Sequence, residues 1–202
     1  MDFSNLLQAL ERHGFLASAY KTVEEAKCAA LRIIGEDSVG TGSSRTINEM
    51  RILDHLIKNG NTVYQYANVT DEEKKVAIRK QALQADVFLS SVNAIIQDGS
   101  LYNIDATGNR VAGMLFGPKT VVVIAGRNKV VRDQAAALVR TRRDCCPPNT
   151  RRLKLDTPCA KMDRCTDCNC PGRICRAFVT LACPTRHVDR FYVLLVDQIL
   201  GW

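Results

Sequence analysis

Two hydrophobic periodicities alternate along much of the chain. Apolar runs rich in β-branched residues predict buried strands, most clearly at 86–92 and 120–125. Between the strands, apolar residues recur three and four positions apart, which predicts helices with one buried face. Helices are expected at 2–13, from Thr22 onward, from Thr46 to Gly60, from Thr70 to Gln84, at 110–116 and from Asn128 to Arg143. Further strands are expected at 38–40, 62–66, 100–104, 177–182 and 190–196.

This order of elements predicts an α/β fold. Strands that alternate with helices form a mostly parallel sheet with helices on both faces, and such sheets bind ligands at the carboxyl ends of their strands. The length of 202 residues suits a single domain, 1–202. The pattern breaks at Cys145-Cys146-Pro147-Pro148, and the cysteine-rich stretch 145–176 has little periodicity before the last strands. We therefore expect 145–176 to be a functional insertion within the domain.

Composition and charge exclude some classes of protein. No apolar run is long enough to span a membrane, and the N-terminus lacks the features of a signal peptide, so we expect a soluble, cytoplasmic protein. The net charge is +7, and the segment from Arg140 to Arg176 holds ten Lys or Arg against four Asp. Aromatic residues are absent from that segment, so nucleic-acid binding is not favoured. The positive charge instead indicates a local site.

The cysteine spacing predicts a metal centre. The chain has nine cysteines, an odd count that cannot pair fully, and a reducing compartment favours metal ligands over disulfides. Cys159, Cys165, Cys168 and Cys175 follow the spacing C-x5-C-x2-C-x6-C, which suits four thiolate ligands of an iron–sulfur cluster or of zinc. The spacing does not separate these two, and a set of reduced thiols without metal is the alternative. The isolated Cys28 is expected to be a small core residue.

A glycine-containing turn is the first candidate for ligand binding. Gly40, Thr41, Gly42 and Ser43 link a strand end to a helix, where free backbone N–H groups suit a phosphate or carboxylate. The turn is neither a P-loop nor a dinucleotide fingerprint. By itself it is more typical of an ordinary tight turn followed by an N-cap.

The second candidate follows the strand expected at 100–104. Asp98 or Asp105 is a candidate general base, and Arg110 is a candidate fork for an anionic substrate, with Gly108 and Asn109 beside them. Ordinary turn chemistry explains Asp-Gly and Gly-Asn pairs equally well. The residues alone leave both interpretations open.

Four stretches of the chain together resemble a known family. These are VGTGSS, the central block DVFLSSVNAIIQDGSLYNIDATGNRVAGMLFGPKTVVVIAG, the end RFYVLLVDQILGW, and TPC…CTDCNCPGRIC. They resemble the lactate-utilisation (LUD) domain family over nearly the whole chain, and the last stretch is similar to the cysteine-bearing tail of a short-form subgroup. That subgroup has serine where this chain has Cys170, so we expect Cys170 to be a bystander thiol. The glycine turn and the positions from Asp105 to Arg110 match the family pattern, which favours binding sites there.

The resemblance implies a fold similar to the sugar-phosphate isomerase and CoA-transferase superfamily. It also implies a protein of lactate-oxidising systems that include iron–sulfur subunits. The first hypothesis is thus a lactate-utilisation-type protein with a [4Fe–4S] cluster in organic-acid oxidation or electron transfer. The second is a non-redox isomerase or acyl transferase with structural zinc, in which Asp105 and Arg110 act on an anionic substrate. The third is a redox-sensing binding module.

The expected partners follow from these hypotheses. The ligand is expected to be a small anion, namely an organic acid, a phosphate or a CoA ester. Iron–sulfur redox subunits are expected partners under the first hypothesis, and a homo-oligomer stays open.

Overall fold

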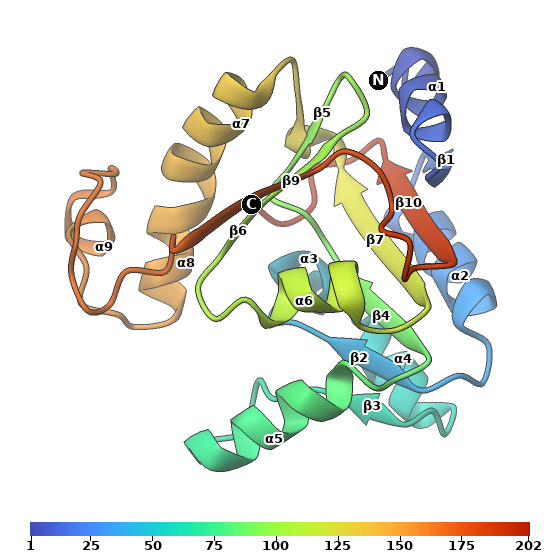
Figure 1. Cartoon of the computed structure of the whole chain (residues 1–202), viewed down its shortest axis with the longest axis horizontal. Helices are drawn as coiled ribbons and strands as arrows, with labels where there is room; N and C mark the ends of the chain where they lie inside the picture. Colours follow the sequence, from blue (N-terminus) through green and yellow to red (C-terminus); the bar gives the residue numbers. More distant parts are fainter.

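The run 120–125 lies in the middle of a six-stranded sheet in the computed structural model, which describes residues 1–202. All neighbouring strands of this sheet are parallel, in the order β1-β10-β7-β4-β2-β3 (Figure 1). Its strands are β1 (Leu16–Tyr20), β10 (Arg190–Val196), β7 (Thr120–Gly126), β4 (Val87–Ser90), β2 (Val39–Thr41) and β3 (Val63–Tyr64). The predicted α/β fold is confirmed.

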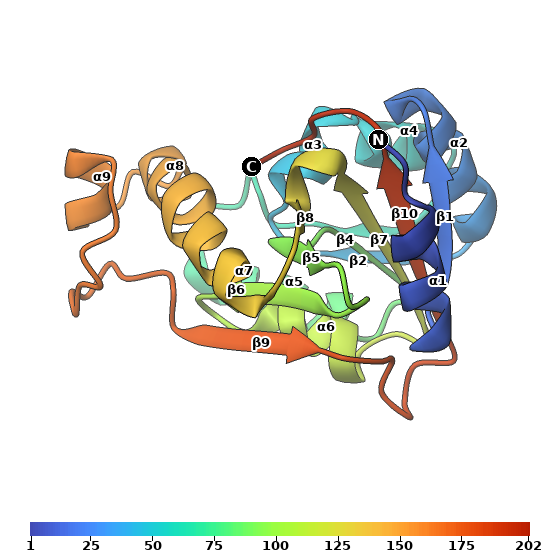
Figure 2. The ribbon, with the colours of Figure 1, turned by 90° about the horizontal axis from the view of Figure 1, so that it is seen from above.

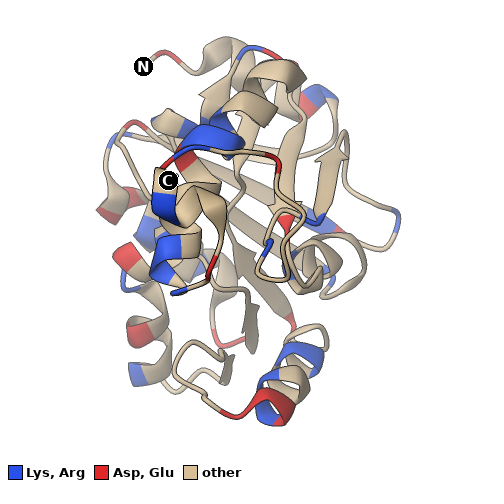
Figure 3. Ribbon diagram, turned by 90° about the vertical axis from the view of Figure 1, so that its left-hand side faces the viewer, with Lys and Arg blue, Asp and Glu red and all other residues tan.

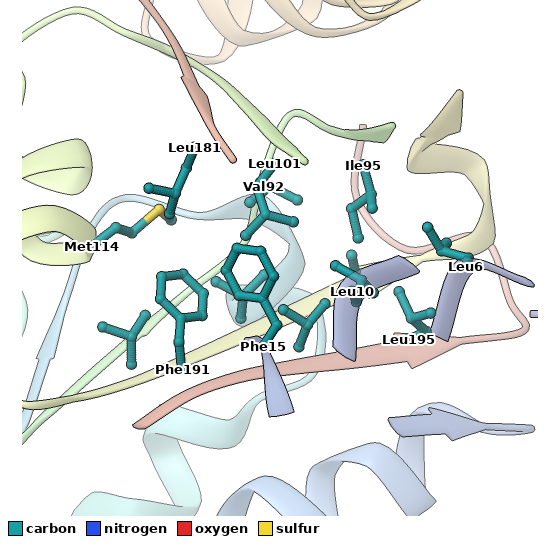
Figure 4. Close-up of a cluster of buried hydrophobic side chains, with 14 of the residues drawn as sticks. Leu6, Leu10, Phe15, Val92, Ile95, Leu101, Met114, Leu181, Phe191 and Leu195 are labelled. Carbon is teal, nitrogen blue, oxygen red and sulfur yellow. The ribbon is translucent and has the colours of Figure 1, made fainter. Parts of the chain in front are cut away.

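Two cores cover the two faces of this sheet, and β7 contributes to both by alternation. Val121 and Val123 point into one core, whereas Val122 and Ile124 point into the other. The second core contains α2 (Val23–Ile34), α3 (Arg45–Glu49) and α4 (Ile52–Lys58). The first contains α1 (Ser4–Arg12) and α6 (Asn109–Phe116), and Figure 4 shows its packed side chains. There the rings of Phe15 and Phe191 meet edge to face, 5.0 Å apart.

A second, four-stranded sheet was not predicted. Its order is β8-β5-β6-β9, and its strands are β8 (Val130–Val131), β5 (Ala94–Ile96), β6 (Leu101–Asp105) and β9 (Ala177–Leu181). One face joins the first core, and the other packs on a third core with α7 (Gln134–Arg140) and α8 (Cys146–Arg152). Figure 2 shows these successive layers. Its strands β5 and β8 are too short to show a period in the sequence.

The prolines at 147 and 148 do not end the helix that precedes them, contrary to the prediction. α7 continues through a π-helical turn, η2 (Thr141–Cys145), directly into α8. Pro147 and Pro148 lie in the first turn of α8, where a helix does not use the N–H group that proline lacks. The insertion without regular structure is therefore shorter than expected, and we call residues 153–176 the cysteine segment. They contain only the short α9 (Pro158–Met162).

Several helix boundaries differ from the predicted ones for local reasons. The helix expected from Thr46 to Gly60 is divided into α3 and α4, because Arg51 has a left-handed backbone with φ of 50°. Asp71 rather than Thr70 caps α5 (Glu72–Ala82). Asn128 lies in the 3-10 turn η1 (Arg127–Lys129), and Asp133 caps α7. The helix expected from Thr22 begins there as α2, and Thr22 and Glu25 form a capping box at its start.

The prediction that Cys28 is a core residue is wrong, because Cys28 is exposed. The buried face of α2 lies one position away, at Ala26, Ala29 and Ala30. No helix in the structure has the length and apolar character that crossing a membrane requires.

Candidate functional site

A cavity of about 360 Å³ opens at the carboxyl ends of β2 and β4. Ser43–Thr46 line it after β2, Ser91–Asn93 after β4, and Lys129 after β7. The start of α6, one side of α8 and Trp202 complete the wall. Pockets for small molecules in proteins have volumes of roughly 300–1,000 Å³. The cavity therefore lies where an open parallel sheet binds ligands, and it has the size of a compact ligand.

The wall of the cavity is strongly basic. One carboxylate, that of Asp105, faces six cationic side chains from five elements: Arg45, Lys75, Arg79, Arg110, Lys129 and Arg152. Figure 3 shows Lys and Arg on the helix beside the C-terminus, which is at the rim of this cavity. Low-dielectric walls concentrate the field of such charges, so the cavity favours an anion.

Arg79 is the cation with the fewest protein partners. Its Nε is buried and has no hydrogen-bond acceptor, and its guanidinium lies over the ring of Tyr66, 4.6 Å from the centroid. Arg152, in contrast, donates to Asn149 Oδ1 at 2.8 Å and to Ser43 Oγ at 3.1 Å, both through Nη2. A buried donor without an acceptor is costly, which makes Arg79 the prime candidate for contact with an anionic ligand.

Lys129 lies at the base of the cavity and is 3% exposed. Its Nζ donates to Thr46 Oγ1 at 2.6 Å and to Ser91 Oγ at 2.8 Å. Both acceptors are neutral hydroxyls, so no carboxylate is hydrogen-bonded to the ammonium group. Burial lowers the pKa of Lys129 to about 7, and the nearby Arg140 guanidinium adds to this effect. Near neutral pH, Lys129 therefore exists both as the ammonium and as the free amine.

Arg110 is already bound by the protein. Its Nη1 and Nη2 donate to two backbone carbonyls and two side-chain amides, at 2.6–3.1 Å: Ser91 O, Asn103 Oδ1, Asn93 Oδ1 and Ile104 O. Burial lowers its pKa, partly opposed by Asp105, whose Oδ2 lies 3.9 Å from Nε. The structure thus brings Arg110 to the cavity with its terminal N–H groups engaged.

Asp105 and its neighbours form the start of α6. The carboxylate accepts from the backbone N–H groups of Thr107, Gly108 and Val111 at 3.0–3.2 Å. Gly108 has φ of +86°, and Asn109 donates to the Tyr66 hydroxyl at 3.3 Å. Asp105 therefore caps a helix, where the positive end of the helix dipole stabilises it.

Asp98 is not brought to the cavity. It lies in the turn between β5 and β6, where it accepts from the N–H and the hydroxyl of Ser100 at 2.8 and 2.6 Å. Gly99 beside it has φ of +96° and packs against α1, because a Cβ there would lie 2.7 Å from the Ala9 backbone. Among the predicted residues, Asp98 thus forms turn contacts only.

The glycine turn contributes one side chain to the cavity, that of Ser43. A Cβ on Gly40 would lie 2.0 Å from the Ala82 carbonyl oxygen, so glycine there permits the close approach of β2 to α5. Gly42 packs against the stem of Arg110, and the Thr41 hydroxyl donates to Leu89 O at 2.9 Å. The turn shapes the wall beside the cations.

The four predicted metal ligands are spread along the cysteine segment. No three His, Cys, Asp or Glu side chains lie close enough together to hold a metal ion. Cys159 is buried between the hydroxyls of Thr150 and Thr157, and Cys168 contacts Cys170 with the two sulfurs 3.6 Å apart. As folded, the segment does not fit a tetrahedral centre. Figures 1 and 2 show α9 at the outer edge of the molecule, beyond α8.

Two cysteines outside the predicted set line the cavity. Cys145 accepts a hydrogen bond from Arg140 Nη1 at 2.9 Å. Cys146 and Cys175 lie together in the third core, and the interaction of their thiols raises the pKa of Cys146 and lowers that of Cys175. The cavity and the cysteine segment therefore meet at this pair.

The profile of the LUD domain family matches residues 4–196. The chain belongs to the LUD domain family. It is therefore a lactate-utilisation-type protein, as the resemblance of its central block indicated. A search of curated proteins finds no match.

The fold of this LUD domain is shared with a solved structure. A DUF162 family protein from Deinococcus radiodurans aligns with a TM-score of 0.55 at 12% sequence identity. The alignment covers 97% of this chain and 99% of that chain. At this identity the likeness concerns the fold alone, and it supports the α/β arrangement described above.

Sequence reasoning missed several side chains of the LUD-domain cavity, chiefly Lys129, Arg79, Arg152 and Cys145. Lys129 carried a usable signal, because it follows the clearest buried strand at its carboxyl end, where α/β sites lie. Arg79 and Arg152 carried none. They lie on helices rich in other Lys and Arg residues, and only the folded chain shows which of these side chains face the cavity.

Proposed function

We propose that this LUD-domain protein binds a small organic-acid anion in the cavity and acts on it there. The observation that carries this proposal is the Arg79 guanidinium, whose buried Nε has no protein acceptor, in a wall of six cations and one carboxylate. A carboxylate is a planar acceptor that a guanidinium matches with two parallel hydrogen bonds. The volume of the cavity suits a compact acid, whereas most of a CoA ester would have to lie outside it.

The other groups around Arg79 suit the same ligand. The ring of Tyr66 holds the guanidinium from one side, which limits its rotation and keeps its N–H edge available. Ser43 and Ser91 supply hydroxyls to the wall, and hydroxyls can donate to a second carboxylate oxygen or to a 2-hydroxy or 2-oxo group. Binding is thus assigned to Arg79 with Arg152 nearby, and Arg110 keeps the wall in shape.

Calorimetric titration with lactate, pyruvate and inorganic phosphate tests the binding. We expect a carboxylate to bind, and Arg79→Met to weaken it by about tenfold or more, which is about 1.4 kcal/mol. Arg132→Met is the matched control, because the Arg132 side chain is 80% exposed, pairs with Asp133 and lies outside the cavity. Equal affinity of the Arg79→Met variant and the native protein, or no binding of any of the three anions, contradicts the proposal.

The cysteine segment supports a second candidate function, a metal centre that forms when the segment closes. The supporting observation is Arg173, which donates to Cys168 O at 2.5 Å and to Cys175 O at 2.9 Å. The Arg173 side chain thus links the backbone at two of the four predicted ligands, Cys168 and Cys175. We propose that a metal, as an iron–sulfur cluster or zinc, draws Cys159 and Cys165 to the same place.

Metal analysis of protein purified without oxygen tests this second function. We expect iron with sulfide, or zinc, and we expect Cys168→Ser to remove it, because each thiolate is a ligand of the centre. Cys183→Ser is the control, since Cys183 is exposed and lies outside the segment. If neither iron nor zinc is present, the segment is a set of thiols and this second function is discarded.

A further inference from the structure

Lys129 is a buried group for which anion binding has no evident use. Only 3% of the Lys129 surface is exposed, yet the side chain lines the cavity. Three separate parts of the chain place it: η1 carries it, and Thr46 of α3 and Ser91 after β4 accept from its Nζ. A lysine in this position is costly, because desolvation disfavours its charge and no carboxylate is hydrogen-bonded to it.

The environment of Lys129 suits a free amine better than an ammonium. The guanidiniums of Arg110 and Arg140 disfavour a third positive charge close by, and burial acts in the same direction. A lysine amine without its proton is a nucleophile, and desolvation beside other cations is how such amines are activated in proteins. A lysine that only bridged two hydroxyls would gain nothing from facing a cavity.

We propose that Lys129 is a catalytic amine that forms an imine with an anionic carbonyl compound, of which a 2-oxo acid is the simplest. This inference rests on the proposed function, because the cations of the cavity must hold the anionic group while the carbonyl meets Nζ. It adds the reacting group and restricts the substrate to compounds with an aldehyde or ketone near the anionic group.

The step needs no oxidant and no further reactant. The lone pair of Lys129 Nζ adds to the carbonyl carbon, and the carbonyl oxygen takes up a proton to give a carbinolamine. The hydroxyl group then leaves as water together with a proton from the nitrogen, and the C=N bond remains. Ser91 Oγ accepts from Nζ and has no acceptor for its own proton, so it is the group placed to donate to the oxygen.

Borohydride trapping tests the imine in the native protein. The protein is incubated with pyruvate or with dihydroxyacetone phosphate, then with sodium borohydride, and is digested for peptide mass mapping. We expect one stable adduct, on Lys129, whose mass equals that of the carbonyl compound less one oxygen atom. Modification by pyruvate identifies a 2-oxo acid as the ligand type, and modification by dihydroxyacetone phosphate identifies a phosphorylated ketone.

The controls separate the imine from anion binding. Lactate has no carbonyl, so its calorimetric binding reports on the anion site alone. Lactate binding without an adduct on Lys129 from either carbonyl compound overturns the imine and leaves the proposed function standing. An adduct on Lys75, which also lines the cavity, overturns it as well. The mapping uses the native chain, so its result does not depend on whether a Lys129→Met variant folds. In a folded Lys129→Met variant, we expect the adduct to be absent.

Discussion

The cavity and the cysteine segment differ in how their candidate site residues are distributed along the sequence and in the fold. The cavity collects Arg45, Arg79, Lys129 and Arg152 from four elements far apart in the sequence. The cysteine segment holds its candidate ligands within a short stretch, yet the fold brings no three of them together. Closeness in sequence therefore does not by itself assemble a site, whereas a parallel sheet does so by aligning its strand ends.

The two regions also differ in how far their positive charges are offset by carboxylates. In and around the cysteine segment, Arg151 pairs with Asp163, Lys161 with Asp156, and Arg173 with Asp167, so the cations and carboxylates largely offset one another. Most of these pairs are exposed and stabilise the fold little. In the cavity, Arg45 pairs with Glu49 and Lys75 with Glu72, whereas Arg79, Lys129 and Arg152 have no carboxylate partner. The excess positive charge of this part of the sequence acts at the cavity through Arg152.

The largest effect is expected at Lys129. The unfolded chain keeps a proton on this lysine up to its ordinary pKa, whereas the folded chain releases it above about pH 7. Burial of the charge thus costs most at low pH, and the stability of the native protein rises with pH through this window. Lys129→Met removes the cost, so it should be more stable than the native protein at pH 6, by an amount on the order of 3 kcal/mol.

Urea denaturation at several pH values measures this effect. The gain should shrink by pH 10, where the lysine of the native fold is neutral. The charged groups that face Lys129 are Arg110, Arg140, Cys145 and Glu49, and the two guanidiniums keep their charge throughout. Lys75→Met is the control, because Lys75 is paired with Glu72. A Lys129→Met variant that is less stable at every pH would show that the ammonium is structural.

The next effect is expected at Arg110, which distinguishes a wall residue from a ligand residue. Arg110→Met removes four hydrogen bonds and leaves the buried Asn103 Oδ1 unpaired, which should cost on the order of 3 kcal/mol in unfolding free energy. Chemical denaturation measures it, and Arg132→Met should change stability by less than about 0.5 kcal/mol. If stability is retained while anion binding is lost, Arg110 is the substrate fork that the sequence suggested.

The smallest effect compares two neighbours on α8. Arg152 faces the cavity, whereas Arg151 pairs with Asp163 and does not line it. Arg152→Met should weaken carboxylate binding by about fivefold, or about 1 kcal/mol, and Arg151→Met should leave it unchanged. Titration of both variants checks this. Equal losses for both would mean that the ligand responds to net charge rather than to the cavity.

The main fold features could be predicted from the sequence because they follow from local periodicity. The run 120–125 had to be buried on both faces, and the capping box at Thr22 satisfies N–H groups within a single turn. The short strands β5 and β8 carried too few residues for a period. The two prolines misled because the π-helical turn before them keeps the helix continuous, with residues of α7 and α8 on either side of it packed in the third core.

The α/β architecture, the family and the basic, cysteine-rich end can all be read from the order of residues along the chain. Those properties depend on which residues are present and in what order. The folded chain is needed to see that Lys129 is buried between two hydroxyls, that Arg79 Nε lacks an acceptor and that Arg110 is engaged by the protein. Burial and hydrogen bonding depend on contacts between segments that are distant in the sequence. These contacts lower the pKa of Lys129 and leave the Arg79 Nε unpaired, which makes the two side chains suitable for a site.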